Sequence, residues 1–212
     1  MRLRYLYILL AVVMLASCAS KRSAVGNVPE HPKREFRGAW IQAVNGQFTG
    51  MSEQEMKGYL VDMLNNLQLV NVNAVMFQVR VEGDALYESR YEPWSRFLTG
   101  VQGKSPGWDP LAFMVEECHK RNMELHAWIN PYRARTKGTK SVAPNHRSAT
   151  RPADFISYEG QLYFNPSLQS NRDHICGIVR DILNRYDVDG LHIDDYFYPY
   201  PTAGKEFADE AW

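Results

Sequence analysis

The sequence predicts an α/β fold in which helices cover a parallel β-sheet. Between positions 34 and 212 the spacing of hydrophobic residues alternates between the period of two typical of strands and the period of 3.6 typical of helices. Strands that alternate with helices favour a parallel sheet. Long loops follow two of the strands, as in a (β/α)8 (TIM) barrel that builds its site at the carboxyl ends of its strands. A doubly wound open sheet is the alternative, but no glycine-rich phosphate-binding turn follows the first strand.

The first half of this region contains two predicted strands and one helix. Residues 36–44 and 73–81 are short stretches rich in strand-forming side chains. Ser52 is placed to cap the helix between them, and Glu55, three residues later, completes a capping box. Apolar residues then recur at helical spacing, at Met56, Tyr59, Leu60, Met63, Leu64 and Leu67.

The second half repeats the pattern. Asp109 and Pro110 predict the start of a second helix. Residues 123–130 form a third strand, a long loop leads to a helix that ends near Tyr186, and residues 188–196 form a fourth strand. Four such units are about half of a barrel, so we expect the chain to be part of a longer protein. A half-barrel that completes itself by dimerising is the alternative.

Residues 1–17 predict a secretory signal peptide, because a basic start precedes an apolar run too short to span a bilayer. Residues 15–18, Leu-Ala-Ser-Cys, resemble the bacterial lipobox, so we expect lipidation of Cys18. Residues 18–33 then form a flexible tether. We expect a lipid-anchored protein of the cell envelope, on the outer membrane and facing the periplasm. A plain signal peptide with an incidental cysteine is the alternative.

Composition excludes several classes of protein. The 24 basic and 24 acidic side chains balance, so no electrostatic argument favours a nucleic-acid partner. Three cysteines are too few for a disulfide scaffold or a zinc cluster. The sequence predicts no cofactor and identifies no protein partner. Aromatic residues make up 12% of the chain, and several fall in the strands and loops that would surround a ligand.

Strand alternation predicts which side chains face away from the helices. In the third strand, Leu125 and Ile129 suit the side covered by helices, which leaves His126 and Trp128 on the other. The same reasoning places Trp40 inside and gives an inward set toward the carboxyl ends of the strands: Gln42, Gln78, Arg80, His126, Trp128, Asn130, His192 and Asp194. Polar groups are costly to bury unless they are hydrogen-bonded or meet a ligand, so this set is the candidate site.

Asp194 and Asp195 end the fourth predicted strand, where barrel enzymes place catalytic groups. A carboxyl group there could serve as a general acid. The second carboxylate could then be the neighbouring aspartate or Glu82. Two structural alternatives remain open. One aspartate could pair with Arg80 or cap a helix, and Glu82 could stabilise its loop.

Loop residues offer further contacts to a polar ligand such as a sugar. Asn130-Pro131-Tyr132-Arg133 follows the third strand, and Tyr196 follows the fourth. Asparagine, tyrosine and arginine can hydrogen-bond to hydroxyl groups, whereas simple turn formation by the Asn-Pro pair is the alternative. His126, His192 and Asp194 could together form a metal site, but their spacing does not require one and we predict none.

Four motifs occur in order along the chain: residues 36–40 (FRGAW), 73–80 (NAVMFQVR), 126–133 (HAWINPYR) and 187–196 (DVDGLHIDDY). Together they resemble the glycosyl hydrolase-like 10 family of bacterial lipoproteins, over residues 32–212. The resemblance implies a TIM-barrel glycosidase fold and a cell-envelope polysaccharide as substrate. A member of this family cleaves peptidoglycan glycan strands stripped of their peptides, which favours that substrate here. Analogy with related barrel glycosidases implies that the aspartates of the fourth strand are catalytic.

We therefore expect a lipid-anchored glycoside hydrolase in which residues 34–212 form the glycosyl hydrolase-like 10 domain. Asp194 is the expected general acid, with Asp195 or Glu82 as its partner. The residues expected to contact the polysaccharide are Gln78, Arg80, His126, Trp128, Asn130, Tyr132, Arg133, His192 and Tyr196. A non-catalytic glycan-binding lipoprotein on a barrel scaffold is the alternative, and a metal-dependent hydrolase is a weaker third.

Overall fold

A computed structural model describes residues 35–195, 197 and 199–207. The predicted signal peptide, Cys18 and the tether at 18–33 lie outside the described residues, as does Tyr196. Among the helices in the described part of the chain, none combines the length and apolar character needed to cross a membrane.

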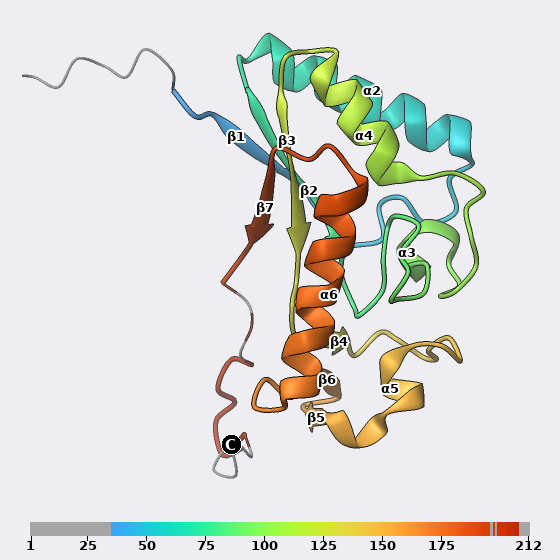
Figure 1. Cartoon of the computed structure of the whole chain (residues 1–212), viewed down its shortest axis with the longest axis vertical. Helices are drawn as coiled ribbons and strands as arrows, with labels where there is room; N and C mark the ends of the chain where they lie inside the picture. The colour runs from blue at the N-terminus through green and yellow to red at the C-terminus, as the bar shows by residue number, and fades with distance from the viewer. Residues whose placement is uncertain (1–34, 196, 198, 208–212) are drawn as a thin grey trace, which may run out of the picture. The chain divides into compact units, whose positions relative to one another are not determined.

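Four parallel strands form the main sheet: β1 (Gly38–Ile41), β2 (Ala74–Arg80), β3 (Glu124–Ile129) and β7 (Gly190–Ile193). They lie side by side in the order of the chain, β1-β2-β3-β7 (Figure 1). A doubly wound sheet reverses its strand order at a switch point, and this sheet does not. Its sequential order is that of successive strands in an α/β barrel, as the sequence predicts.

The strands are shorter than predicted at their carboxyl ends. After Ile41 the chain leaves the ladder, and the backbone amides of Ala43 and Val44 donate instead to Oε1 of Gln78, at 2.9 and 3.1 Å. A side chain of β2 thus satisfies backbone groups that a longer β1 would have paired with its neighbour.

Three long helices accompany the sheet: α2 (Glu53–Leu69), α4 (Pro110–His119) and α6 (Gln169–Arg185). The Ser52 hydroxyl accepts from the amide of Glu55, whose carboxylate accepts from the amide of Ser52, so the predicted capping box is present. Asp109 caps α4 as predicted, accepting from the amide of Ala112 at 2.9 Å.

The hydrophobic core lies between these helices and one face of the sheet. Strand residues predicted to face the helices, such as Val75, Phe77, Leu125 and Ala127, are fully buried there. The helices contribute Met56, Leu60, Leu64, Leu111, Met114, Cys118, Ile178 and Ile182. The opposite face of the sheet is therefore left for polar and aromatic side chains, as alternation predicts.

The two long loops are more structured than the sequence indicates. The loop after β2 contains the short helix α3 (Arg96–Thr99). The loop after β3 contains an antiparallel sheet in the order β4-β6-β5, a short helix and a 3-10 turn, with these bounds: β4 (Arg133–Arg135), α5 (Arg147–Thr150), η1 (Pro152–Asp154), β5 (Phe155–Tyr158) and β6 (Gln161–Phe164). Figure 1 shows these elements beyond the carboxyl ends of the parallel strands.

Candidate active site

A hollow of about 550 Å³ opens toward the carboxyl ends of β1, β3 and β7. It is lined by Trp40, Trp128, His192, Ile193, Asp194 and Asp195. Trp40 is 61% exposed, whereas Trp128 is buried. The hollow therefore combines one exposed and one buried indole with two carboxylates, and four of its six residues come from β7 or directly follow it.

His192 is held between the two tryptophans. Its Nε2 accepts a hydrogen bond from the indole Nε1 of Trp40 at 3.0 Å. Its ring meets those of Trp40 and Trp128 edge to face, with centroids 5.8 and 6.0 Å away. Because Nε2 accepts this bond, Nδ1 is the ring nitrogen left to donate to a ligand.

Two polar atoms of the hollow are shielded from solvent without a partner in the described part of the chain. They are Oδ1 of Asp194 and Nε1 of Trp128. Buried polar atoms in folded proteins are normally hydrogen-bonded, so these two are available to a ligand or a water molecule that reaches them. Asp195, in contrast, is exposed at the rim.

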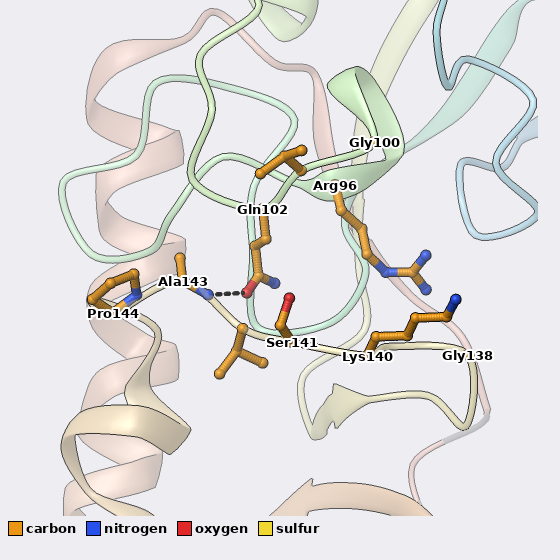
Figure 2. A pocket seen from close by; sticks show the side chains of 10 residues that line it. Arg96, Gly100, Gln102, Gly138, Lys140, Ser141, Ala143 and Pro144 are labelled. Carbon is orange, nitrogen blue, oxygen red and sulfur yellow. Dashed lines mark hydrogen bonds between the residues drawn. The ribbon is translucent and has the colours of Figure 1, made fainter.

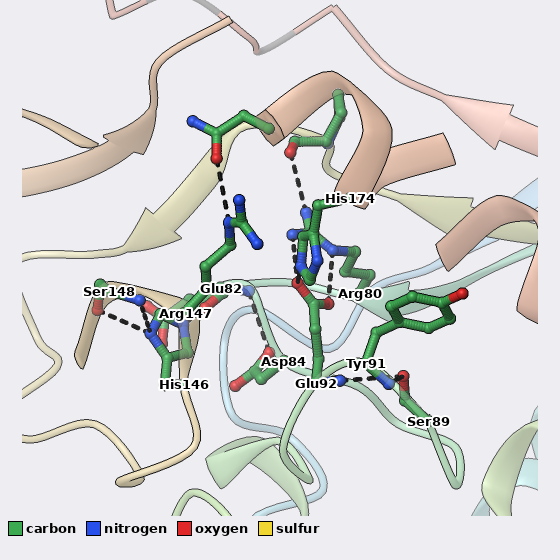
Figure 3. A network of polar contacts seen from close by, with 12 residues as sticks. Arg80, Glu82, Asp84, Ser89, Tyr91, Glu92, His146, Arg147, Ser148 and His174 are labelled. Atoms are coloured by element: carbon green, nitrogen blue, oxygen red, sulfur yellow. Dashed lines mark hydrogen bonds and ion pairs between the residues drawn. The ribbon is translucent and has the colours of Figure 1, made fainter. Parts of the chain in front are cut away.

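Arg80 and Gln78 do not reach this hollow, and the structure does not support the expected contact with a sugar. Arg80 is fully buried and forms a bidentate pair with Glu92, at 2.7 and 2.6 Å (Figure 3). The imidazole of His174 lies 3.1 Å from the same carboxylate. Burial raises the pKa of Glu92, but the charge of Arg80 and the hydrogen bonds outweigh it and bring that pKa to about 2. The side-chain oxygen of Gln78 instead accepts hydrogen bonds from the backbone amides of Ala43 and the following residue.

Glu82 is also buried, and its contacts favour the loop-stabilising alternative over a catalytic role. Its carboxylate pairs with Arg96 at 2.8 Å and accepts from the Thr139 hydroxyl and the Thr136 amide. Burial raises its pKa, but these hydrogen bonds and the Arg96 charge lower it further, so the net shift is downward. The neighbouring Asp84 is completely buried, and that burial raises its pKa.

None of the remaining predicted residues that the structure describes lines the hollow, and two of them hold the loops. Oδ1 of Asn130 accepts from the amide of Arg133 at 2.8 Å, which is the turn chemistry named as its alternative. Nε of Arg133 donates to a backbone carbonyl of the loop after β2. Tyr132 is half-buried. His126 pairs with Glu124 at 3.0 Å, toward the amino ends of the strands. Among the described residues, no group of three His, Cys, Asp or Glu side chains is placed to hold a metal ion.

Sequence reasoning places Trp40 on the inner face of the sheet, but it misses two other residues that shape this region. Glu92 was not identified as the partner of Arg80, because the loop between them gives no periodic signal. Arg96, the partner of Glu82, lies in a four-residue helix that is too short to show a pattern.

Sequential parallel strands, with an aromatic hollow and carboxylates at their carboxyl ends, define this protein as part of an α/β barrel of the glycosidase type. Solved structures agree on the fold. The chain resembles α-L-fucosidase isoenzyme 2 from Paenibacillus thiaminolyticus, with a TM-score of 0.54 and 15% identity over 76% of this chain and 24% of that one. It also resembles the maltogenic α-amylase AmyB from Thermotoga neapolitana, with a TM-score of 0.50 and 17% identity over 76% of this chain and 39% of that one.

The chain belongs to the glycosyl hydrolase-like 10 family, which matches residues 35–212. It is 44% identical to the glycosyl hydrolase YngK of Bacillus subtilis (strain 168), over 84% of this chain and 36% of YngK. It is 41% identical to the glycosyl hydrolase DigH of Escherichia coli (strain K12), over 66% of this chain and 34% of DigH. The chain thus spans about a third of the length of the curated relatives that it matches.

Proposed function

We propose that the complete protein is a glycoside hydrolase acting on a cell-envelope polysaccharide. The observation that carries the proposal is the shielded, unpartnered Oδ1 of Asp194 in a hollow walled by Trp40 and Trp128. Aromatic rings offer flat apolar surfaces against which a sugar can lie. A carboxyl group that lines the same hollow can supply the proton that breaking a glycosidic bond requires. Membership of the glycosyl hydrolase-like 10 family supports this reading.

In the proposed reaction, Asp194 protonates the glycosidic oxygen as its bond to the sugar breaks. Asp195 lines the same hollow and is our candidate for the second carboxylate, which stabilises the positive charge that develops on the sugar ring or activates water. His192, oriented by its bond from Trp40, can donate from Nδ1 to a sugar hydroxyl. We do not assign Glu82 to the chemistry, because its carboxylate is occupied by Arg96 and two threonines.

We propose peptidoglycan glycan strands stripped of their peptides as the polysaccharide. Two curated relatives are named glycosyl hydrolases. The lipobox-like residues 15–18 favour a lipid anchor at Cys18 and a periplasm-facing place on the outer membrane. Peptidoglycan is the abundant polysaccharide in that compartment, and a site with two tryptophans suits a chain of sugar rings.

The test is the release of new reducing ends from peptide-stripped peptidoglycan by the complete protein. We expect Asp194→Asn to lower kcat by about 10²- to 10⁴-fold, the range typical of a general acid. Asp187→Asn is the matched control, because Asp187 is an exposed aspartate that precedes β7 and does not line the hollow. Its rate should equal that of the wild type.

Two outcomes would contradict the proposal. Cleavage by Asp194→Asn at the wild-type rate would exclude Asp194 as the acid. Saturable binding of the glycan by the complete wild-type protein, with no new reducing ends, would instead identify a non-catalytic glycan-binding protein on the same scaffold.

A further inference from the structure

A second hollow, of about 530 Å³, lies between the loop after β2 and the loop after β3 (Figure 2). One wall is formed by Arg96 and residues 100–102, and the other by Gly138 and residues 140–144. It shares no lining residue with the hollow of Asp194. We call it the loop pocket.

The walls of the loop pocket are tied to each other at two points. The amide of Ala143 donates to Oε1 of Gln102 at 3.0 Å, a bond drawn in Figure 2, and Nε2 of Gln102 donates to Asp84 at 3.0 Å. At the second point, the buried carboxylate of Glu82 binds Arg96 of one wall and Thr139 beside the other. Because both loops are held by buried groups, the pocket exists before a ligand enters, and a ligand need not spend binding energy on ordering it.

The loop pocket carries an excess of positive charge. Segments 96–104 and 136–145 contain four Lys or Arg residues and no Asp or Glu, although the whole chain is balanced. The charge of Arg96 is matched by Glu82 beneath it. Lys140 is exposed and forms no ion pair within the described ranges, and in Figure 2 its side chain extends to the same side of the pocket as that of Arg96. A cation is therefore left available to a ligand.

The backbone of the same wall has donors to offer. In the segment of Lys140, Ser141 and Val142, which has no regular secondary structure, none of the three backbone amides has an acceptor within the described residues. A lysine ammonium group beside free amides is an arrangement suited to a carboxylate, whose two oxygens accept several hydrogen bonds at once. A neutral sugar hydroxyl would gain much less from the charge.

We propose that the loop pocket binds a carboxylate carried by a sugar of the glycan, away from the bond that is cut. This inference rests on the proposed function, because peptide-stripped peptidoglycan carries a free lactyl carboxylate on every second sugar. A strand lying in the hollow of Asp194 would then be held at a second point, and the protein would distinguish an acidic glycan from a neutral one.

The test measures equilibrium binding of the complete protein, carrying Asp194→Asn to prevent cleavage, to three glycans. They are peptide-stripped peptidoglycan strands, the same strands with their carboxyl groups reduced to alcohols, and polygalacturonate as a second carboxylate source. For each glycan, the affinity of this parent protein is compared with the affinities of the variants that also carry Lys140→Ala or Lys140→Gln. Lys137→Ala is the matched control, because it removes the same charge from the same loop without lining the pocket. Thermal unfolding checks that every variant is folded.

We expect Lys140→Ala and Lys140→Gln to weaken binding of the native strands about fivefold at low salt, and less at high salt. Neither should change binding of the reduced strands, and Lys137→Ala should change neither. Equal weakening for native and reduced strands, or an equal effect of Lys137→Ala, would overturn the proposal. Lys140-dependent binding of polygalacturonate but not of peptidoglycan would keep the carboxylate site and overturn the proposed substrate. If the complete wild-type protein releases no reducing ends but glycan binding still depends on Lys140, only the proposed hydrolase activity is overturned.

Discussion

The indole Nε1 of Trp40 in β1 donates to Nε2 of His192 in β7 across 3.0 Å, although two other strands separate β1 from β7. In a flat sheet the outer two of four strands would lie about 14 Å apart, given a spacing of about 4.8 Å between neighbours. The bond therefore requires the sheet to curve, with its concave face carrying the hollow of Asp194. Curvature of this kind is what closes a barrel.

Trp40→Phe should weaken glycan binding without unfolding the protein. The substitution keeps an aromatic ring but removes the hydrogen bond that orients His192. We expect KM to rise about tenfold while the free energy of unfolding falls by about 1 kcal/mol, the typical contribution of one hydrogen bond. Steady-state kinetics with peptide-stripped peptidoglycan and urea unfolding give both values. Trp108→Phe, at a tryptophan outside the hollow, should leave KM unchanged, and an equal rise there would refute the assignment.

Glu92→Gln should be strongly destabilising. It leaves the fully buried guanidinium of Arg80 without its counter-charge, and breaking a buried pair in this way costs about 3–5 kcal/mol. Urea unfolding measures the loss. Glu53→Gln is the control, because the pair of Glu53 with Lys57 lies at the surface with both side chains partly exposed, and should contribute about 0.5 kcal/mol or less. Similar losses for the two variants would show that burial of the Arg80 pair does not matter.

Acid should destabilise the protein over a window set by Glu92. Its pKa is about 2 in the folded protein, against 4.5 without the fold, so protonation favours the unfolded state. The stabilisation is complete above pH 4.5 and is lost as the pH falls toward 2. Urea unfolding at a series of pH values should show this decrease. In Glu92→Gln the decrease should be smaller, and an unchanged pH dependence would assign it to other carboxylates.

Gly190→Ala should destabilise the sheet, whereas Gly58→Ala should not. A Cβ at Gly190 would lie 2.5 Å from Nδ1 of His126, whose ring is also held by Phe36 and Glu124. We expect a loss of about 1–3 kcal/mol from this overpacking. Gly58 lies exposed within α2, with nothing within 4 Å of an added Cβ. Alanine there should therefore raise the free energy of unfolding by about 0.5–1 kcal/mol. Thermal unfolding of both variants tests the pair, and a Gly190→Ala variant as stable as the wild type would contradict the close packing of the His126 ring on Gly190.

Cys18→Ala should abolish lipid attachment in the complete protein. Cells expressing the wild type should incorporate labelled palmitate into the protein and retain it in the membrane fraction. Cys176→Ala is the matched control, because Cys176 is an exposed cysteine of α6 and should not affect labelling. Labelling that survives Cys18→Ala would exclude the lipobox-like residues as the modification site.

The elements that sequence reasoning predicted are those with a periodic or local signal. The α2 capping box needs only Ser52 and Glu55, and the burial of Val75 and Leu125 follows from alternation in a sheet covered on one face. The small sheet of the third loop was missed because its strands have three or four residues each. One local signal was present: Glu159 and Gly160, both with positive φ, form the two-residue turn between β5 and β6.

The candidate site was predicted in part, for a similar reason. Alternation placed Trp128 and His192 correctly, and both line the hollow. It also placed Arg80 on the inner face, but the depth of Arg80 depends on a loop that folds over it. Several carboxylates follow Arg80 in that loop, and only the folded chain selects Glu92 as its partner. Pairings between a strand and a loop depend on tertiary distance, which spacing along the chain does not encode.

The carboxylate of Glu82, bonded to Arg96 in one loop and to Thr136 and Thr139 in the other, has an evolutionary consequence. Neither loop can change its contact to this group alone, because the loss of one partner leaves a buried charge incompletely compensated. Because Thr136 contributes only its backbone amide, substitutions at Glu82, Arg96 and Thr139 should therefore occur together in different lineages of the family. The two loops that frame the mouth of the barrel should diversify as one inherited unit.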